Sequence, residues 1–186
     1  AQLGSLAQNA IQRKKDEDGL TVLDGATTDL PGAGNTLTSG HIASAVYRIS
    51  SNTTEPGNPP YRCVLHGFQL KDIFDEIVQG IGTYNVPEGL TARVFAEGFR
   101  GQIANAQLYE DGNISIDGNA DAKGGVFAQE AIILVQGRAP RTATVRREDI
   151  GGGATVVYLY DEYAYGERSS GNWLYEIMSD ATAPTS

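Results

Sequence analysis

The side chains best suited to metal binding or nucleophilic catalysis are one cysteine and two histidines. Cys63 and His66 have the spacing of half a zinc site, but His41 is the only other histidine and no second ligand pair follows to complete four ligands. Residues three apart on a strand point to opposite faces, so Cys63 and His66 are not placed to act as a catalytic dyad. We therefore predict a buried thiol and a histidine at a strand end, without a chemical role.

Carboxylates give a second set of candidates. Residues 117–121 (Asp-Gly-Asn-Ala-Asp) resemble the first half of a calcium loop, which requires Gly at its sixth position and Glu at its twelfth. This chain has Ala122 and Ala128 there, so we predict a polar turn. Asp161 and Glu162 are neighbours on a predicted strand and face opposite ways, which prevents them from acting as acid and base on one substrate.

Glycine pairs give the last candidates for chemistry. The pairs at Gly32 and Gly34 and at Gly80 and Gly82 lack both a following lysine and a strand–turn–helix context, so neither is predicted to hold phosphate. We accordingly predict no catalytic site, no cofactor and no metal, and the protein is not expected to be an enzyme. A small hydrolase using scattered carboxylates and a β-rich carbohydrate-binding module are the alternatives from other classes.

The elements that would position these residues are helices first and strands later. Apolar residues recur at helical spacing over residues 3–26, 38–49 and 68–78, and a shorter helix is predicted over 87–95. Gly19 leaves open whether the first helix ends there or continues to Gly25, because glycine costs about 1 kcal/mol against alanine within a helix. One strand, residues 61–66, lies among the helices. This order predicts an α+β fold.

Six further strands are predicted in the second half of the chain. Residues 107–110 and 113–117 flank Asp111-Gly112, which is a strong hairpin signal. Residues 131–136 are continuously apolar, as expected of a strand covered on both faces. The other predicted strands are 141–148, 155–165 and 173–178.

The strand over residues 155–165 is unusual because both of its faces are substantially apolar. Tyr158 and Tyr160 share one face, and tyrosine is favoured at protein interfaces because it joins a large apolar ring to a polar tip. Basic residues also gather in patches, and complementary charge sets the register between subunits. An internal strand and merely solvated charges are the alternative reading. The predicted subunit interface comprises Arg13, Lys14, Lys15, Arg146, Arg147, Tyr158, Tyr160 and Glu162.

Length and composition narrow the class of protein. The 186 residues suffice for one domain or two small ones, and a formal net charge of −9 argues against tight binding to nucleic-acid phosphates. A single cysteine rules out an intrachain disulfide. No stretch approaches the roughly 20 apolar residues of a membrane-spanning helix, and the start lacks a secretory pattern. The first residue is Ala1, so we expect a processed or truncated start.

Four stretches of the sequence resemble the major capsid proteins of tailed bacteriophages. They are residues 37–42 (LTSGHI), 61–72 (YRCVLHGFQLKD), 152–158 (GGATVVY) and 171–181 (GNWLYEIMSDA), and the likeness extends over about residues 6–183. The resemblance implies the HK97-type capsid fold. Its spine helix would occupy residues 1–26, its peripheral domain 27–79 and 138–186, and its axial domain 80–137. Members of that family carry an N-terminal arm and an extended loop before the spine helix, whereas the given sequence begins at the helix. We expect either that these parts were removed or replaced or that the sequence is a fragment, which leaves the contacts they supply open.

The resemblance also implies a function and a set of partners. Subunits of the family form pentamers and hexamers that close an icosahedral shell around double-stranded DNA, without sequence-specific DNA binding and without a membrane. Portal, scaffold or decoration proteins complete such particles, which are virions assembled in the cytoplasm of the bacterial host. An encapsulin-like nanocompartment shell, which would enclose a cargo enzyme, is the alternative within the same fold.

Overall fold

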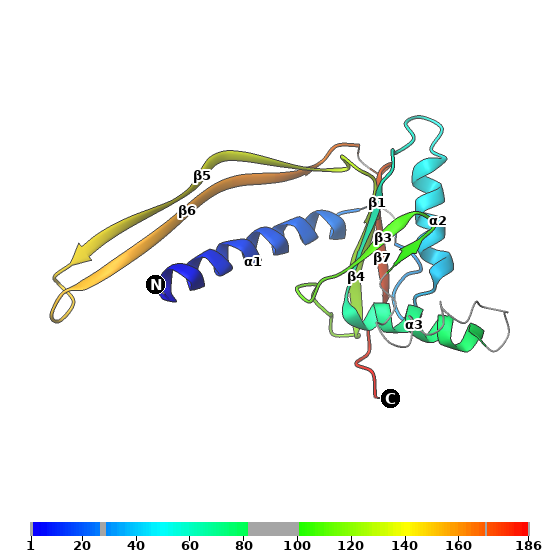
Figure 1. Cartoon of the computed structure of the whole chain (residues 1–186), viewed down its shortest axis with the longest axis horizontal. Helices are drawn as coiled ribbons and strands as arrows, with labels where there is room; N and C mark the ends of the chain where they lie inside the picture. Colours follow the sequence, from blue (N-terminus) through cyan, green and yellow to red (C-terminus); the bar gives the residue numbers. More distant parts are fainter. Residues whose placement is uncertain (1, 27–28, 82–100, 170, 186) are drawn as a thin grey trace.

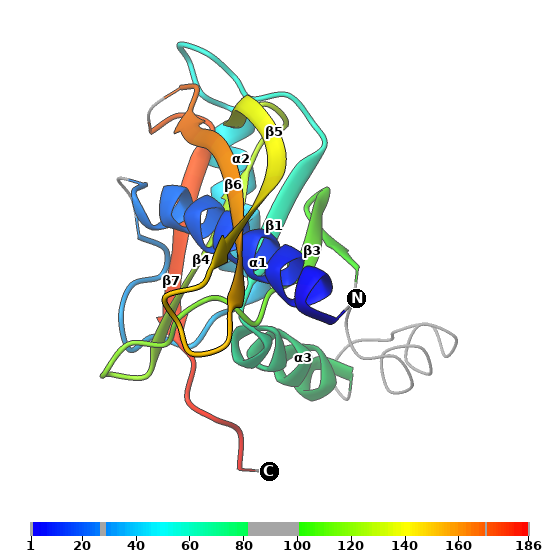
Figure 2. The same ribbon diagram turned by 90° about the vertical axis from the view of Figure 1, so that its left-hand side faces the viewer.

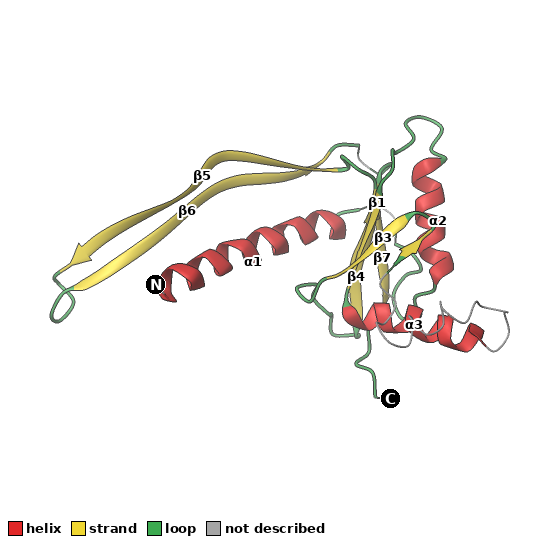
Figure 3. Ribbon diagram, viewed as in Figure 1, coloured by secondary structure: helices red, strands yellow, loops and turns green. Residues whose placement is uncertain are grey.

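The computed structural model describes residues 2–26, 29–81, 101–169 and 171–185. Helices and strands are mixed along the chain, which confirms the predicted α+β class (Figure 3). In order they are α1 (Gln2–Asp24), α2 (Ser39–Ser50), β1 (Tyr61–Leu65), α3 (Gly67–Ile81), β2 (Gln102–Ile103), β3 (Ala106–Glu110), β4 (Asp121–Phe127), β5 (Ile132–Arg147), β6 (Ala154–Glu167) and β7 (Leu174–Asp180).

A five-stranded sheet with two helices beside it forms the body of the molecule (Figure 1). Its strand order is β2-β3-β1-β4-β7, with β1 and β3 parallel and the other pairs antiparallel. The edge of β7 is covered by residues 29–32, since the backbone N–H groups of Leu30 and Gly32 donate to the carbonyls of Glu176 and Met178. This pairing leaves fewer unpaired backbone groups at that edge.

The core lies between this sheet and α2 and α3. The apolar stripe of α2, which includes Ile42 and Ile49, packs with Ile73 of α3 and with strand residues such as Cys63 and Ile177. Burial of such side chains contributes roughly 25 cal/mol per Å² of apolar surface. The two helices are also joined by hydrogen bonds, because Glu76 of α3 accepts from the backbone and hydroxyl of Ser39 at the start of α2 (2.7 and 3.1 Å).

An elongated arm projects from the body and consists of α1 and the β5–β6 hairpin (Figure 1). The two strands are antiparallel, with register irregularities between Gln136 and Arg138 and between Arg138 and Arg141. Figure 2 views the molecule along the arm and shows α1 beside β6. The hairpin is inserted between β4 and β7, and its two ends meet where the N–H of Arg168 donates to the carbonyl of Ala131 (2.9 Å).

Helix α1 continues through Gly19 to Asp24, which settles the question that the sequence left open. A side chain at Gly19 would meet Tyr165 of β6, whose ring atoms lie 3.7–3.9 Å from the position of a Cβ atom. A Cβ atom there would make ordinary van der Waals contact with Tyr165, so α1 packs directly against β6 at this point. Within the described residues, no helix is both long and apolar enough to cross a membrane.

The predicted hairpin around Asp111-Gly112 is wrong. Strand β3 ends at Glu110 and pairs with β1 and β2, whereas residues 113–117 form only an isolated bridge from Ile116 to Ala122. The N–H of Asp111 donates to the carbonyl of Leu65, and its carboxylate accepts from the N–H of Asn113 (2.8 Å). The turn therefore carries the chain away from the sheet instead of folding it back on β3.

The prediction that residues 131–136 form a strand covered on both faces is also wrong. Ala131 is buried, but Ile133, Leu134 and Val135 are 42%, 47% and 60% exposed. They belong to β5, which is one continuous strand of 16 residues in a two-stranded hairpin, and not to two separate strands within a large sheet. Continuous apolar sequence here marks an exposed surface of the molecule.

The structure does not test two other predictions, the helix over residues 87–95 and the division into named domains. The helix predicted over residues 87–95 lies outside the described residues. The five-stranded sheet takes strands from the ranges assigned to both the peripheral and the axial domain, because β1 and β7 fall in the first range and β3 and β4 in the second. The division of the chain into those named domains stays a prediction.

Candidate subunit interface on the extended arm

The inner face of the β5–β6 hairpin is held against α1 by polar contacts. The Lys15 ammonium lies 2.5 Å from the carboxylate of Asp161, whose side chain is only 4% exposed, and 5.0 Å from the centre of the Tyr163 ring. The hydroxyl of Tyr163 donates to Asp18 (2.8 Å). We call Lys15, Asp161, Tyr163 and Asp18 the helix–hairpin clamp.

The clamp shifts the ionisation of two of its members. Hydrogen bonds from Lys14 and then from Tyr163 lower the pKa of Asp18. Burial, followed by the nearby charge of Asp18, raises the pKa of Tyr163 to about 12. At neutral pH the clamp therefore contains a charged carboxylate and a protonated phenol, which is the state that forms the hydrogen bond.

The outer face of the hairpin, turned away from α1, is aromatic and cationic. The cross-strand register places Arg138 opposite Glu162, Arg141 opposite Tyr160 and Ala143 opposite Tyr158. The Tyr158 and Tyr160 rings stack with centres 6.2 Å apart, and the Arg141 guanidinium lies 5.3 Å from the centre of the Tyr160 ring. Arginine and tyrosine are enriched among the residues that dominate binding energy at protein interfaces.

Most of the exposed large apolar side chains of the described residues lie on this hairpin. Eight of the twelve are there, and only Leu6, Tyr47, Tyr109 and Ile116 lie elsewhere. Such a concentration is a mark of an interaction surface. The eight are Ile133, Leu134, Val135, Val145, Ile150, Val157, Tyr158 and Tyr160.

The residues predicted for the interface fall into three separate places. Tyr158, Tyr160 and Glu162 share the outer face of the hairpin. Arg146 and Arg147 lie near its tip, where they pair with Glu148 and Asp149 at 3.3 and 2.6 Å.

The three basic residues of α1 differ from one another in their contacts. Arg13 and Lys14 form ion pairs with Glu17 and Asp18 along the helix (2.9 and 2.5 Å), whereas Lys15 belongs to the clamp inside the subunit. Sequence reasoning left Arg141 out of the interface set. The signal that identifies it is its cross-strand partner Tyr160, which only the register reveals.

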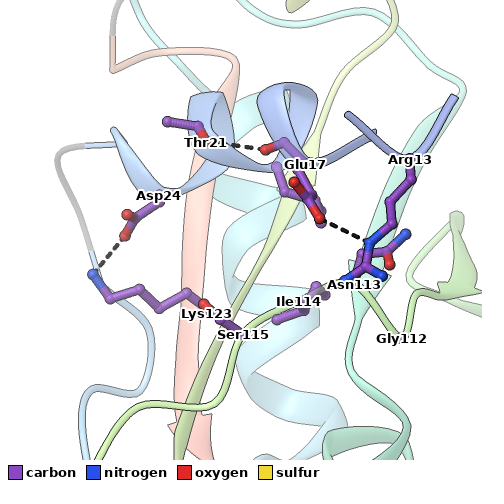
Figure 4. Close-up of a pocket in the computed structure, with 10 residues that line it drawn as sticks. Arg13, Glu17, Thr21, Asp24, Gly112, Asn113, Ile114, Ser115 and Lys123 are labelled. Carbon is purple, nitrogen blue, oxygen red and sulfur yellow. Dashed lines mark hydrogen bonds and ion pairs between the residues drawn. The ribbon is translucent and has the colours of Figure 1, made fainter. Parts of the chain in front are cut away.

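A cavity of about 490 Å³ lies between α1, the loop at residues 112–115 and β4 (Figure 4). Its walls carry the ion pairs Arg13–Glu17 and Lys123–Asp24 (2.9 and 2.5 Å), and the hydroxyl of Thr21 donates to the carbonyl of Glu17. These charged groups already pair with one another and provide no nucleophile beside a base. The cavity is therefore a packing gap between elements that ion pairs hold together, and not a catalytic site.

Cys63, His66 and Asp117, the candidates for chemistry in the sequence, have structural roles. Cys63 is completely buried, and burial raises the pKa of its thiol, which makes it unreactive. The ring of His66 accepts from the N–H of Phe68. The carboxylate of Asp117 accepts from the N–H groups of Asn119 and Asp121, as in a polar turn. In the part of the chain that the structure describes, no group of His, Cys, Asp and Glu is arranged to hold a metal ion.

Comparison with known proteins identifies the fold. No protein-family model and no curated sequence matches the chain. The structure of Mycobacterium phage Che8 matches with a TM-score of 0.70 and 15% identity over 98% of this chain and 63% of that one. The capsid of cyanophage P-SCSP1u matches with a TM-score of 0.68 and 11% identity, and the head of Helicobacter pylori bacteriophage KHP40 with 0.58 and 13%. The cyanophage match covers 97% of this chain and the Helicobacter phage match covers 93%. Each match covers 66% of the other chain.

This chain therefore has the fold found in phage capsid and head structures, which confirms the likeness expected from the sequence. It spans just under two thirds of the length of those chains. At 11–15% identity the match concerns the fold alone.

Proposed function

We propose that this protein is a non-enzymatic capsid subunit of a tailed bacteriophage that assembles with copies of itself into a closed shell. The observation that carries the proposal is the match of 97% of the chain to the capsid structure of cyanophage P-SCSP1u with a TM-score of 0.68. A likeness over nearly the whole chain leaves little room for a separate catalytic unit within it. The shell is of the HK97 type, with α1 as its spine helix.

The arm supports self-assembly on physical grounds. A two-stranded hairpin is marginally stable by itself in water, and α1 covers only its inner face. Eight large apolar side chains remain exposed on it, so burying them against a neighbouring copy is favourable. Many modest contacts of this kind, repeated around a closed shell, give a stable particle through avidity.

The contents and partners of the shell follow from the same proposal. Pentamers and hexamers of the subunit enclose double-stranded DNA in an icosahedral virion, which assembles in the host cytoplasm with portal, scaffold or decoration proteins. A net charge of −9 is suited to an inner wall that should not adhere to packaged DNA. The shell therefore holds the genome by enclosure and not by sequence-specific binding.

Electron microscopy and sedimentation of the purified full chain test the proposal. Closed particles are expected, filled with DNA when they are isolated from infected cells. Particles with an enzyme cargo would favour the encapsulin-like alternative. A monomer at every concentration, with a melting temperature that rises when a small molecule is added, would refute the shell role.

The interface role of the two stacked tyrosines has a separate test. The double variant Tyr158→Ser/Tyr160→Ser should lower particle yield at least tenfold while leaving the melting temperature of the isolated subunit within about 3 °C, since both rings are already largely exposed. The matched control is Tyr47→Ser/Tyr109→Ser, which removes two exposed tyrosines from the body. Normal assembly of the hairpin variant would remove these rings from the interface.

A further inference from the structure

The charges of the arm are divided between its two strands. Every charged residue of β5 is an arginine, at positions 138, 141, 146 and 147. Every charged residue of β6 is acidic, namely Asp161, Glu162 and Glu167. One long side of the hairpin is therefore cationic and the other anionic.

These charges differ in how far the subunit itself neutralises them. Asp161 is paired with Lys15 inside the clamp. Arg146 and Arg147 near the tip pair with Glu148 and Asp149. Glu162 is 68% exposed, and its one ion pair within the described residues is with Arg138, at 3.5 Å. No carboxylate among the described residues lies within ion-pair distance of Arg141, although its guanidinium is held over Tyr160. Arg141 and Glu162 are thus the exposed, incompletely paired charges in the middle of the hairpin.

The long side formed by β5 is also free of backbone partners. Within the described residues β5 pairs only with β6, and its residues from Ile133 to Arg147 are exposed. A strand edge of this length attracts a further strand. Side chains set which strand it accepts, because like charges placed opposite each other across a strand pair are destabilising and opposite charges are stabilising.

Two arrangements of neighbouring copies are open to such a hairpin. In a two-fold arrangement β5 would meet β5, which brings arginine toward arginine when the strands overlap centrally. In a head-to-tail arrangement the arginine strand of one copy meets the acidic strand of the next, and the contact repeats around a ring. Charge favours the second arrangement, in which the outer faces of neighbouring hairpins, with their stacked tyrosines, lie side by side.

We propose, building on the self-assembly described above, that hairpins of successive copies lie side by side in head-to-tail order, with Arg141 of one copy paired to Glu162 of the next. The occupant of the free side is a second copy of this chain. A nucleic acid fits less well, because the surface beside Arg141 is apolar and the chain as a whole is acidic.

Charge reversal in the full chain tests this pairing. Arg141→Glu and Glu162→Arg should each lower particle yield at least tenfold, with the subunit melting temperature unchanged. Soluble subunits of the two variants, mixed in equal amounts, should regain association as mixed oligomers in sedimentation, because each reversed strand then meets its complement on another molecule. Closed particles are not required of the mixture, since a five-membered ring cannot alternate two variants. Arg141→Gln should give a smaller loss, and Arg48→Glu, the same charge change on the exposed surface of α2, should assemble as the wild type does.

Each other outcome contradicts the pairing in its own way. Undiminished or improved assembly of Arg141→Glu would indicate a two-fold contact in which arginines repel. Loss without recovery on mixing would place the effect inside one subunit. Normal but DNA-free particles of Arg141→Glu would assign the arginine to nucleic acid. If the wild-type chain formed no particles, the shell function itself would fail, whereas the three preceding results leave that function standing and overturn only the pairing.

Discussion

At the scale of single residues, Glu176 is a buried carboxylate that is incompletely hydrogen-bonded. It projects from β7 beneath the last turn of α1, its side chain is 3% exposed, and one of its carboxylate oxygens has no hydrogen-bond donor. Lys123 lies 3.5 Å away but is 2.5 Å from Asp24, so one ammonium serves two carboxylates. Burial, together with the nearby charges of Asp29 and Asp24, raises the pKa of Glu176 to about 7, against the opposing effect of Lys123.

This raised pKa predicts a specific dependence of stability on pH. The folded subunit holds the Glu176 proton up to about pH 7, whereas the unfolded chain releases it near 4.5. The folded state therefore binds more protons in this window, and its stability falls as the pH rises from about 4.5 to 7. Glu176→Gln should remove this loss and gain on the order of 1–3 kcal/mol above pH 7, with little gain near pH 4.

Chemical denaturation at pH 4 and pH 8 measures this difference. The control is Glu162→Gln, which alters an exposed carboxylate and should not change the pH dependence. An equal effect of Glu176→Gln at both pH values would show that the carboxyl group is not protonated in the folded subunit.

Gly124 shows a steric requirement that is independent of charge. A Cβ atom there would lie 2.3 Å from the carbonyl oxygen of Val64 on the neighbouring strand, which cannot move without disturbing the sheet. Gly124→Ala should destabilise the subunit by about 2–4 kcal/mol in denaturant titration. Gly112→Ala, where nothing lies within 4 Å of the new methyl group, should change stability by less than about 1 kcal/mol. Equal effects at the two sites would contradict the close approach of β4 to β1.

At the scale of elements, the helix–hairpin clamp sets how α1 and β6 lie together. Its geometry depends on Lys15 and Asp161, which form the least exposed of the ion pairs found on the arm. Removing one partner of a shielded pair leaves the other charge uncompensated, which costs more than the pair contributes. The clamp is therefore the point at which the arm is easiest to loosen without changing the core.

Asp161→Asn should loosen the arm selectively. We expect amide hydrogens of α1 to exchange at least tenfold faster, which corresponds to about 1.4 kcal/mol, while those of the five-stranded sheet keep their protection. Asp149→Asn, which alters an exposed pair at the hairpin tip, is the matched control and should leave α1 unchanged. Uniformly faster exchange throughout the subunit would mean that the residue supports global stability instead.

At the scale of the whole molecule, the arm and the body have different physical characters. The body encloses a continuous apolar core, whereas the arm exposes most of its apolar side chains. Because the ends of the hairpin meet at Ala131 and Arg168, the chain can leave the body and return without disturbing the sheet. This construction is consistent with the self-assembly proposed above.

Replacing residues 133–166 by a short glycine-serine linker tests this separation. The shortened chain should keep the circular dichroism signal of a folded α+β domain and lower its melting temperature by no more than about 8 °C, since the main core is untouched. It should form no particles at any concentration in sedimentation. Complete unfolding would show that the hairpin is part of the cooperative fold, and particle formation would exclude the arm from assembly.

The sequence by itself determined the local features of this protein. Helical spacing located α1, α2 and the described part of α3, and runs of β-branched, aromatic and other apolar residues located β1, β6 and β7. The lack of a complete ligand set at Cys63 and His66 was likewise visible in the residue order. These properties depend on residues close together in the chain, which is why pattern alone is sufficient for them.

Only the tertiary structure decided which strands pair and which faces stay exposed. The turn at Asp111-Gly112 is compatible with a hairpin, yet β3 pairs in parallel with β1 because residues distant in sequence supply the better partner. The apolar run in β5 reads equally well as a buried strand or as an interface, since burial depends on what lies opposite it. Arg141 became a candidate interface residue because it lies over Tyr160 across the hairpin. The two residues are 19 positions apart, and no local pattern specifies their contact.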